Sequence, residues 1–394
     1  MIIVIGNGVA GITCAQVVRE KDRTIPILVI TEEKYPYYAR PQIIEFLAGK
    51  IGEEELPFYP SSWYQEKKID VVYGEKGLSV DLDKQILLTT KDKYKYSKLL
   101  IATGAKPSKP PLENIDAKGV FTLRNIDDAK EILDYIKGKE KVVILGCGLL
   151  GLEVGRALSQ RGLKVVGIEF FQRLIPRQLD EEGAKIFQRK LQEKFGFEFY
   201  LGAKAKKVIA ENNIFKGIEL EDGRKILGDL LIVSAGIIPE IDIAKKSGIE
   251  VNKGIIVNEY METNVKYVYS AGDCVEYSGR IYGIIPASLE QGSIAGKNMV
   301  GEKTVYTGTI PFNTLKITGI SLASMGNIEY NEPNAEIFVL KDEEKGFYRK
   351  LIFVDNVIVG AILLENSQKY INKIKSLISS KKIIEKKDEI LYEE

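Results

Sequence analysis

The chain has 394 residues, of which 45% are hydrophobic and 28% charged, and its net charge is +1. This length and composition are typical of a folded protein with two or three domains. The balanced charge argues against nucleic-acid binding, and no apolar run is long enough to cross a membrane. Because the first apolar run starts at residue 2, we expect no signal peptide and predict a cytoplasmic protein.

Histidine is absent, and the three cysteines, Cys14, Cys147 and Cys274, lie far apart in the chain. No C-x-x-C pair is present, which excludes a local redox disulfide and a four-cysteine metal site, so we predict no metal. Cys14 lies on the apolar side of a predicted helix and is interpreted as a buried structural thiol. A protein without histidine lacks the commonest general base and is expected to take its chemistry from a cofactor.

The first eleven residues organise the chain. An apolar run at residues 2–5 predicts a buried strand, and Gly6, Gly8 and Gly11 follow with the G-x-G-x-x-G spacing. In such a turn the first glycine allows the tight bend, the second lets the backbone approach a pyrophosphate, and the third lets helix and strand pack closely. A helix beginning near Val9 and Ala10 would direct its free N–H groups at the phosphates.

Two acids, Glu32 and Glu33, follow the second apolar run, where a carboxylate binds a ribose hydroxyl. Prolines and tyrosines then predict a loop over residues 35–41. Arg40 in this loop is interpreted as a phosphate or flavin contact, with a solvated surface charge as the alternative. A buried strand over residues 99–104 precedes three prolines, where we place a domain boundary.

A second dinucleotide fingerprint follows. A strand over residues 141–145 precedes Gly146, Gly148 and Gly151, and a helix extends from there to Arg161. The next strand ends in Glu169, whose carboxylate favours a free ribose 2′-hydroxyl and therefore NADH over NADPH. Arg173 lies nearby and weakens that preference.

The remaining chain alternates helices and strands. Residues 178–194 predict an amphipathic helix, residues 214–226 a hairpin, and residues 286–300 a helix rich in small residues. The strand ending at Gly272 and Asp273 presents a carboxylate either to a ribityl hydroxyl or to a helix N-terminus as a cap. Beyond residue 310 the pattern predicts a three-stranded meander over residues 335–364, a helix over 368–379 and a charged tail.

The two fingerprints and the strands before Gly104 and Asp273 resemble, in this order, the flavoprotein reductases with two dinucleotide-binding domains. Within that group the chain is similar to the rubredoxin reductases of anaerobes and the flavin-binding part of NADH-dependent nitrite reductase. The motifs that carry the resemblance are Tyr38-Ala39-Arg40-Pro41, Leu47-Ala48-Gly49, residues 146–153, residues 174–180, Met261-Glu262-Thr263 and residues 269–273.

The resemblance implies an α/β fold with two interleaved Rossmann-like domains and a small α+β C-terminal domain. The expected boundaries are 1–107 and 239–308 for the FAD domain, 108–238 for the NAD domain and 309–394 for the C-terminal domain. It implies that FAD and NADH are the cofactors. The FAD contacts implied are Gly6, Gly8, Val9, Ala10, Gly11, Glu32, Arg40, Gly77, Ala102, Thr103, Gly104, Arg124, Gly272 and Asp273. The NADH contacts implied are Gly146, Gly148, Leu149, Leu150, Gly151, Glu169 and Gly236.

One position departs from the family pattern. Many relatives carry a lysine five residues after the matching arginine, paired with the glutamate of the second fingerprint helix near the flavin. Here that position is Glu45, which would face Glu153, and two close carboxylates raise one pKa unless a cation intervenes. Lys316 is the predicted cation, and the alternative is that Glu45 points into solvent.

The resemblance implies an oxidoreductase in which NADH gives a hydride to FAD and electrons pass to a small carrier protein such as rubredoxin. An NADH oxidase that reduces oxygen is the second hypothesis. A redox-sensing flavoprotein similar to apoptosis-inducing factor is the third. The absence of a cysteine in residues 35–49 argues against the single-cysteine peroxidases and the coenzyme A disulfide reductases. A monomer or homodimer is expected, with no nucleic-acid or membrane partner.

Overall fold

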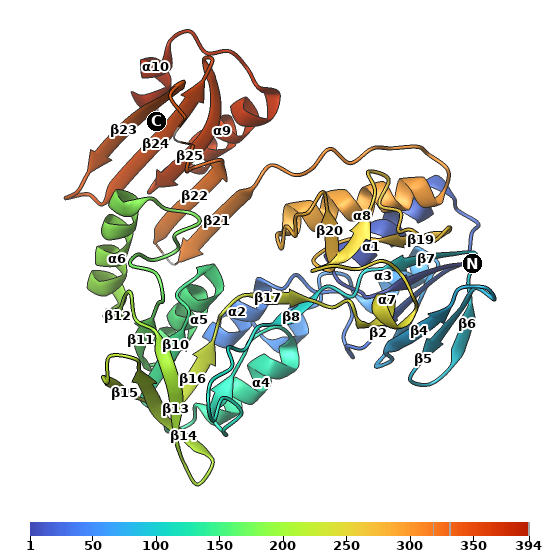
Figure 1. Ribbon diagram of the computed structural model, residues 1–394, viewed down its shortest axis with the longest axis horizontal. Coiled ribbons are helices and arrows are strands. Elements are labelled where there is room, and N and C mark those ends of the chain that lie inside the picture. The colour runs from blue at the N-terminus through green and yellow to red at the C-terminus, as the bar shows by residue number, and fades with distance from the viewer. Residues whose placement is uncertain (318, 331, 393–394) are drawn as a thin grey trace. The chain divides into compact units, whose positions relative to one another are not determined.

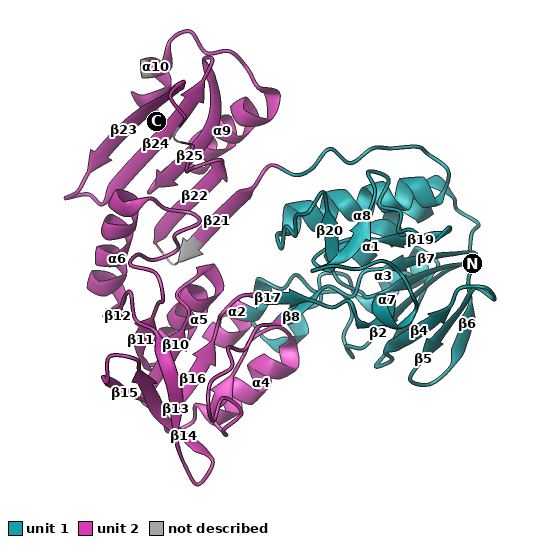
Figure 2. Ribbon diagram, viewed as in Figure 1, with its two compact units in different colours: residues 1–43, 51–106, 237–309 teal, residues 44–50, 107–236, 310–394 magenta. Residues whose placement is uncertain are grey.

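The computed structural model describes residues 1–317, 319–330 and 332–392, and the chain forms two compact units. Unit 1 contains residues 1–43, 51–106 and 237–309, and unit 2 contains residues 44–50, 107–236 and 310–394 (Figure 2). The short segment 44–50 therefore belongs to unit 2, although both of its neighbours in sequence belong to unit 1.

Unit 1 is built on a five-stranded parallel sheet with the order β19-β7-β1-β2-β3, of which Figure 1 labels β19, β7 and β2. Its strands are β1 (Ile2–Ile5), β2 (Ile27–Thr31), β3 (Ile69–Tyr73), β7 (Lys98–Ile101) and β19 (Val268–Ser270). All four residues of β1 are buried, which is expected for a central parallel strand covered on both faces. Because β2 and β7 lie on opposite sides of β1, the carboxyl end of β1 is a switch point of the topology, where ligands of such sheets bind.

Two helices pack closely on one another in unit 1, α1 (Val9–Lys21) and α8 (Ile285–Met299). A Cβ atom on Gly292 of α8 would lie 2.4 Å from the carbonyl oxygen of Ala10, so glycine is required for this approach. The other helical elements of unit 1 are α3 (Ser61–Glu66), α7 (Asp242–Lys246) and the 3-10 turn η1 (Glu53–Glu55). The remaining strands are β4 (Gly77–Asp81), β5 (Ile86–Thr89), β6 (Lys93–Lys95), β8 (Ala105–Pro107), β17 (Ile237–Pro239), β18 (Ile255–Val257) and β20 (Val275–Tyr277).

Unit 2 repeats the order of four of these strands, the central one included, and differs in its edge strand β9, which comes first of its sheet in the chain; the full order is β12-β11-β10-β16-β9, all parallel. The strands are β9 (Val120–Phe121), β10 (Lys141–Leu145), β11 (Lys164–Ile168), β12 (Glu198–Tyr200) and β16 (Leu230–Val233). The central strand β10 has β11 on one side and β16 on the other, as β1 has β2 and β7. An antiparallel sheet of β13 (Ala205–Glu211), β14 (Ile214–Leu220) and β15 (Lys225–Leu227) accompanies it.

Helices of unit 2 follow recognisable sequence signals. Asn125 caps α4 (Ile126–Tyr135) and Asp180 caps α6 (Glu181–Phe195), each by accepting a hydrogen bond from a backbone N–H of the first turn. The helix α5 (Leu149–Gln160) begins after Gly148, which has no side chain to cap it. The helix α2 (Gln42–Ala48) lies where the chain enters the segment 44–50.

The C-terminal part of unit 2 is a five-stranded antiparallel sheet with the order β21-β22-β25-β24-β23. Its strands are β21 (Phe312–Ile317), β22 (Ile320–Gly326), β23 (Ala335–Asp342), β24 (Phe347–Val354) and β25 (Val357–Leu364). The last three confirm the predicted meander, and the β21–β22 hairpin, for which the sequence analysis made no prediction, extends the sheet. The helix α9 (Gln368–Ser380) packs on the sheet, and α10 (Lys387–Tyr392) follows it.

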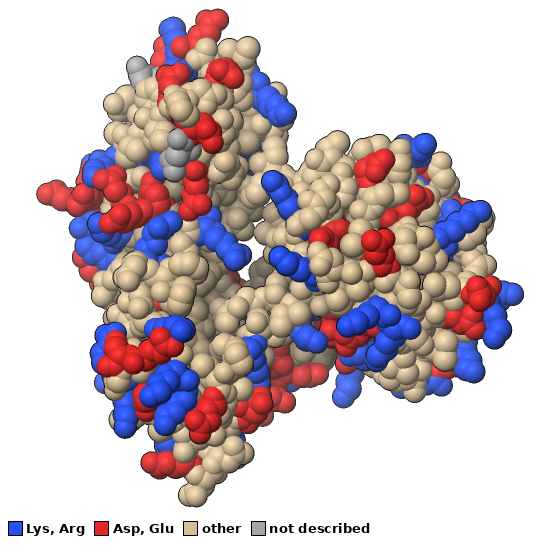
Figure 3. Space-filling view, viewed as in Figure 1, with Lys and Arg blue, Asp and Glu red and all other residues tan. Residues whose placement is uncertain are grey.

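Polar contacts join this sheet to α6. Asp180 accepts hydrogen bonds from the Tyr348 hydroxyl at 2.7 Å and from Lys350 Nζ at 3.0 Å, and Lys190 pairs with Glu365 at 2.9 Å. The cap of α6 is thus fixed by residues of β24. Charged side chains of both signs alternate over the face shown in Figure 3, in keeping with the net charge of +1. Within the described part of the chain, no helix combines the length and apolarity needed to cross a bilayer.

Candidate functional site

The turn after β1 has the geometry of a phosphate-binding loop. Gly6 has φ +106°, and a Cβ atom there would lie 2.2 Å from the carbonyl oxygen of Ala102. A Cβ on Gly11 would lie 2.0 Å from the carbonyl oxygen of Gly6, whereas a Cβ on Gly8 would meet no atom within 4 Å. The first helical bond runs from Ile12 N to Gly8 O at 2.9 Å, so the N–H groups of the first turn are left for a ligand.

The predicted ribose acid of unit 1 is exposed at the surface. The side chain of Glu32 is 67% exposed and pairs with Lys76 at 3.1 Å. Its neighbour Glu33 accepts a hydrogen bond from Arg40 Nη2 at 2.8 Å and another from the Tyr38 hydroxyl. The sequence did not single out Glu33 as the partner of Arg40, because spacing across an irregular loop does not indicate which side chains meet.

Other predicted contacts of unit 1 border the same turn. Gly272 has φ +93°, and its Cβ position lies 2.9 Å from the Cβ atom of Ala10, which puts Gly272 and Asp273 beside the start of α1. Thr103 donates a hydrogen bond to the carbonyl oxygen of Glu240 at 2.6 Å, and Gly104 accepts one from the Glu240 N–H at 2.9 Å. The Cβ position of Gly77 lies 2.9 Å from Ile243 and 3.4 Å from Ile5 at the end of β1.

The turn after β10 repeats this geometry in unit 2. Gly146 has φ +98°, with its Cβ position 2.3 Å from the carbonyl oxygen of Ser234, and the Cβ position of Gly151 lies 2.1 Å from the carbonyl oxygen of Gly146. Gly148 again has open space at its Cβ position. The N–H groups of Leu149 and Leu150 open the first turn of α5, as those of Val9 and Ala10 open α1.

The predicted acid of unit 2 is oriented by the backbone. Glu169 is 6% exposed, and its two carboxylate oxygens accept hydrogen bonds from Cys147 N at 2.8 Å and Phe171 N at 3.0 Å. Arg173 donates to the carbonyl oxygens of Pro176 and Leu179 and pairs with Glu329 at 3.3 Å, so its guanidinium is engaged away from Glu169.

Two predicted contacts of unit 2 lie farther along the chain. Gly236 follows β16 with φ +98°, and its carbonyl oxygen accepts a hydrogen bond from Ser108 N at 2.9 Å. Arg124, predicted as a contact of FAD, lies in unit 2 beside the start of α4, where its N–H donates to Asp128 at 2.6 Å.

Glu45 forms an ion pair with Arg156, a residue that the sequence analysis did not single out. Glu45 Oε1 lies 2.6 Å from Arg156 Nη2, and Glu45 Oε2 lies 3.0 Å from Lys50 Nζ. Burial by itself raises the pKa of Glu45, but the Lys50 hydrogen bond and the Arg156 charge outweigh it and lower that pKa. Lys316 belongs to β21, and its side chain lies outside the part of the molecule that the structure describes.

Glu153 lies one turn before Arg156 on α5 and is partly buried. Burial raises the pKa of Glu153 to about 7; the Arg156 charge opposes the rise and the Glu45 charge adds to it. Glu45, Glu153 and Arg156 therefore form one electrostatic cluster. A signal for Arg156 was present, because it stands at the helical spacing of the buried residues Leu152 and Gly155.

The three cysteines are buried and free. Burial raises the pKa of Cys14 to about 12 and also raises the pKa of Cys147 and Cys274, so none is a ready thiolate nucleophile. Among the described residues, no group of three or more Cys, Asp or Glu side chains is placed to hold a metal ion.

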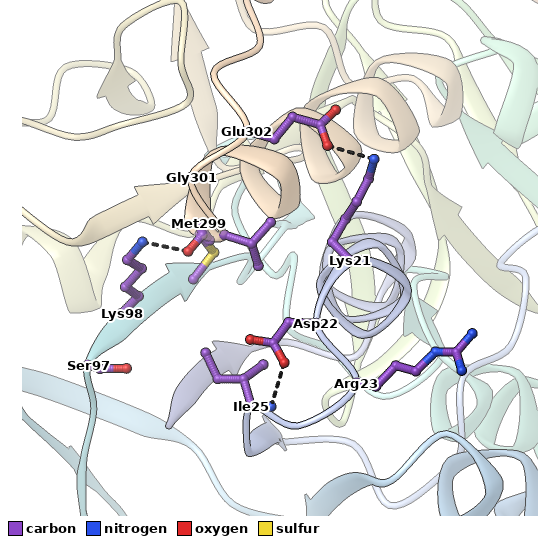
Figure 4. Close-up of a pocket in the computed structure, with 10 residues that line it drawn as sticks. Lys21, Asp22, Arg23, Ile25, Ser97, Lys98, Met299, Gly301 and Glu302 are labelled. Carbon is purple, nitrogen blue, oxygen red and sulfur yellow. Dashed lines mark hydrogen bonds and ion pairs between the residues drawn. The ribbon is translucent and has the colours of Figure 1, made fainter.

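A hollow of about 710 Å³ in unit 1 is a separate feature (Figure 4). It is lined by the end of α1, the start of β7 and the end of α8, at the edge of the sheet opposite the carboxyl end of β1. Both of its lysines already bond within the protein, since Lys21 pairs with Glu302 at 2.6 Å and Lys98 donates to the carbonyl oxygen of Met299 at 2.5 Å. It is therefore not a candidate for the nucleotide sites.

The residues present fit two dinucleotides. Gly8 and Gly148 each have open space where a Cβ atom would stand, in front of free helical N–H groups, and phosphate oxygens match such donors. The ordered carboxylate of Glu169 matches a ribose diol. Each unit thus contains one turn suited to a pyrophosphate.

Comparison with known proteins agrees with this geometry. The family model described as pyridine nucleotide-disulphide oxidoreductase matches residues 1–292, and the model of the rubredoxin NAD+ reductase C-terminal domain matches residues 311–382. The assimilatory nitrate reductase electron transfer subunit of Bacillus subtilis is 31% identical over an alignment of 396 positions, which covers 100% of this chain and 51% of that protein. The chain thus spans about half the length of some curated relatives that it matches.

Two further similarities concern smaller proteins. NADH oxidase of Methanocaldococcus jannaschii is 34% identical over 341 residues, covering 82% of this chain and 75% of the oxidase. The crystal structure of NADH:rubredoxin oxidoreductase from Clostridium acetobutylicum has a TM-score of 0.80 and 30% identity, covering 98% of this chain and 96% of the other. These findings confirm the predicted family, the fold class, the FAD-dependent oxidoreductase class and the FAD and NADH cofactors.

Proposed function

The chain belongs to the pyridine nucleotide-disulphide oxidoreductase family, and from this premise we propose that it is an NADH-dependent reductase of a small redox carrier protein such as rubredoxin. The observation that carries the proposal is the combination of two fingerprint turns with a C-terminal sheet domain of the rubredoxin reductase type. FAD, when bound, accepts a hydride and releases single electrons, and the protein supplies binding and orientation.

Each unit has a defined part in this proposal. In unit 1 the N–H groups at the start of α1 bind the FAD pyrophosphate, and Asp273 and the Arg40–Glu33 pair border the same cofactor. In unit 2 the start of α5 binds the NADH pyrophosphate, and Glu169 accepts the ribose hydroxyl hydrogen bonds. Glu45 and Glu153 are proposed to lie beside the reacting rings.

The buried cysteines favour a carrier over a thiol or disulfide substrate. None of Cys14, Cys147 and Cys274 has a cysteine partner, and burial raises the pKa of each. A disulfide reductase of this family type needs a redox-active thiol that can exchange. Electrons are therefore proposed to leave for the carrier without a thiol intermediate.

The test is NADH oxidation by the purified, FAD-loaded protein with rubredoxin, ferredoxin or oxygen as acceptor. We expect rubredoxin reduction to exceed oxygen consumption by at least about tenfold. Equal or faster oxygen consumption would favour the second candidate, an NADH oxidase, which the similarity to the M. jannaschii protein supports. Slow turnover with every acceptor, together with a long-lived complex of NADH and flavin, would favour a sensor.

The four domain boundaries, the cytoplasmic location and the monomeric or homodimeric state stay predictions. Chromatography with light scattering measures the last of these.

A further inference from the structure

The helix that carries the second fingerprint contains a buried cation. Arg156 is 1% exposed, donates to Glu45 Oε1 at 2.6 Å and donates to Gln160 Oε1 at 3.0 Å. Its Nε atom is also buried and has no hydrogen-bond partner in the described structure. Burying a charge is costly unless it is paired, so the contact with Glu45 is a requirement of this arrangement.

A second arginine of α5 holds the same short segment. Arg161 Nε donates to the carbonyl oxygen of Leu47 at 3.0 Å, and its guanidinium lies against Gly49. Arg156 thus contacts the segment 44–50 through a carboxylate, and Arg161 contacts it through the backbone. Both arginines therefore hold the segment 44–50 against α5, but only Arg156 is paired with a carboxylate there.

The matching helix of unit 1 has no charge at this position. Thr13 and Gln16 of α1 stand at the positions that match Glu153 and Arg156 of α5, counted from Gly6 and Gly146. Gln16 donates a neutral hydrogen bond to the Tyr59 hydroxyl at 3.2 Å. Of these two matching helices, only α5 thus carries a buried charge at this position, which points to a role for the charge in unit 2.

The described charged groups around Glu153 come from two elements, α5 and the segment 44–50. On α5 itself, Arg156 is three residues away and on the same face. The segment 44–50 contributes Glu45 and Lys50. The strand β21 also packs on α5 and carries Lys316, whose side chain is not described.

We propose that Arg156 is a positioning residue, whose guanidinium fixes Glu45 against α5 and supplies the positive charge that allows Glu153 to ionise beside the nucleotide-binding turn. This inference rests on the proposed function in that NADH is taken to bind at this turn. In this role Arg156 takes the place that the sequence assigned to Lys316.

The experiment measures the titration of Glu153 in the full-length, FAD-loaded protein, by NMR with 13C-labelled glutamate carboxyls. Glu153→Gln identifies the signal by its loss. The wild-type midpoint is expected near pH 7. Arg156→Met should raise the midpoint by about 1 pH unit or more, because an opposite charge within about 4–6 Å lowers a carboxylate pKa by about 1–3.

Glu45→Gln should move the midpoint in the opposite direction, because it removes a like charge, and by a smaller amount because Lys50 already neutralises part of Glu45. Arg156→Lys should restore a midpoint close to wild type. Arg161→Met is the matched control, since it loosens the same segment without removing the charge next to Glu153, and it should leave the midpoint in place.

The Glu153 midpoint should rise in Arg156→Met and fall in Glu45→Gln if charge is the cause. If the variants only loosened the segment 44–50, water would enter and the midpoint would fall in both. A midpoint that falls or stays fixed in Arg156→Met would overturn the inference. If that variant does not fold, a midpoint that fails to fall in Glu45→Gln overturns it equally. None of these measurements needs an electron acceptor, so normal titration shifts with failed rubredoxin reduction would refute the proposed function alone.

A second readout connects the cluster to the nucleotide. The pH profile of flavin reduction by NADH, followed by stopped flow, should move with the Glu153 midpoint in each variant. If the midpoint moves in the NMR titration and the profile does not, Arg156 governs the charge of Glu153 without serving hydride transfer, and the positioning role is refuted.

Discussion

The two fingerprint turns have the same backbone conformation, but the residue at the end of the second strand of each sheet, β2 or β11, differs. Gly6 and Gly146 have φ values of +106° and +98°, and each would place a Cβ atom within 2.3 Å of a carbonyl oxygen from the neighbouring strand's end. Gly6 N donates to the carbonyl oxygen of Ile30 and Gly146 N to that of Ile168, so Thr31 and Glu169 occupy matching positions.

The acid is therefore displaced by one residue in unit 1. Glu169 is buried and held by two backbone N–H groups, whereas Glu32 is exposed and pairs with Lys76. The turn that we propose to bind a pyrophosphate is repeated in the two units, and the buried acid that we propose to bind a ribose is not. A feature made of backbone atoms, the glycine turn, is therefore repeated more closely between the two units than a feature made of one side chain, the acid.

The largest expected effect comes from substituting glycines in the turn of unit 2, which tests whether its backbone conformation requires them. Gly151→Ala places a Cβ atom 2.1 Å from the carbonyl oxygen of Gly146, so α5 must move, and we expect a loss of about 1–3 kcal/mol in the free energy of unfolding. Gly148→Ala meets no protein atom and should keep stability while weakening NADH binding at least about tenfold. Urea unfolding and NADH titration separate the two variants. Equal destabilisation by both would contradict the account of the turn.

The next effect concerns the displaced acid. Glu169→Gln removes the charge and keeps an acceptor for one backbone N–H, so the preference for NADH over NADPH should shrink by about 10–100-fold, equal to about 1.4–2.8 kcal/mol. The measurement is kcat/KM for both nucleotides. Glu32→Gln is the control in unit 1 and should leave the ratio unchanged. A wild-type protein that uses both nucleotides equally would refute the role of Glu169.

Much of the fold could be predicted from the sequence because its signals are local. The apolar run at residues 141–145 is β10, and the predicted meander at residues 335–364 is β23, β24 and β25. The β21–β22 hairpin was missed because β22 contains Ser321, Ala323 and Ser324, which have weak strand preference, and its pairing with β25 determines its structure. Similarly, the partner of Glu45 lies on another helix, and sequence spacing carries no information about such a pair.

A smaller effect is a dependence of stability on pH, which is expected from Glu153 of α5 and not from the matching residue of α1. The pKa of Glu153 is raised from 4.5 to about 7 in the folded protein, so the folded state binds more protons than the unfolded state between these values. Stability from this group is fully present below pH 4.5 and is lost as pH rises through 7. Glu153→Gln should therefore gain about 1–3 kcal/mol over wild type at pH 8 and almost nothing at pH 4.5.

Thermal or urea unfolding of both proteins across this range is the measurement. Thr13→Val, at the matching position of α1, is the control and should show no such dependence on pH. A constant difference between Glu153→Gln and wild type at all pH values would show that the carboxyl titrates normally in the folded protein.

The smallest effect concerns the three buried cysteines, of which Cys147 lies between the first two glycines of its turn. Asn7 donates a hydrogen bond to the Tyr64 hydroxyl at 3.0 Å, while the matching Cys147 is buried. Replacing Cys14, Cys147 and Cys274 with serine should change NADH oxidation less than about threefold, or under 1 kcal/mol, because no thiol takes part. A triple variant that binds FAD and NADH normally but cannot pass electrons would prove this wrong.

The grouping of residues 44–50 with unit 2 has a consequence for how the chain can be divided. A gene fragment encoding only residues 107–236 would contain the whole second nucleotide-binding sheet but would lack Glu45. In that fragment Arg156 would have lost its carboxylate and Arg161 the carbonyl group of Leu47. Residues 107–236 alone therefore leave these contacts incomplete. A chimeric protein that takes this domain from the chain needs residues 44–50 as well, or a substitution of Arg156.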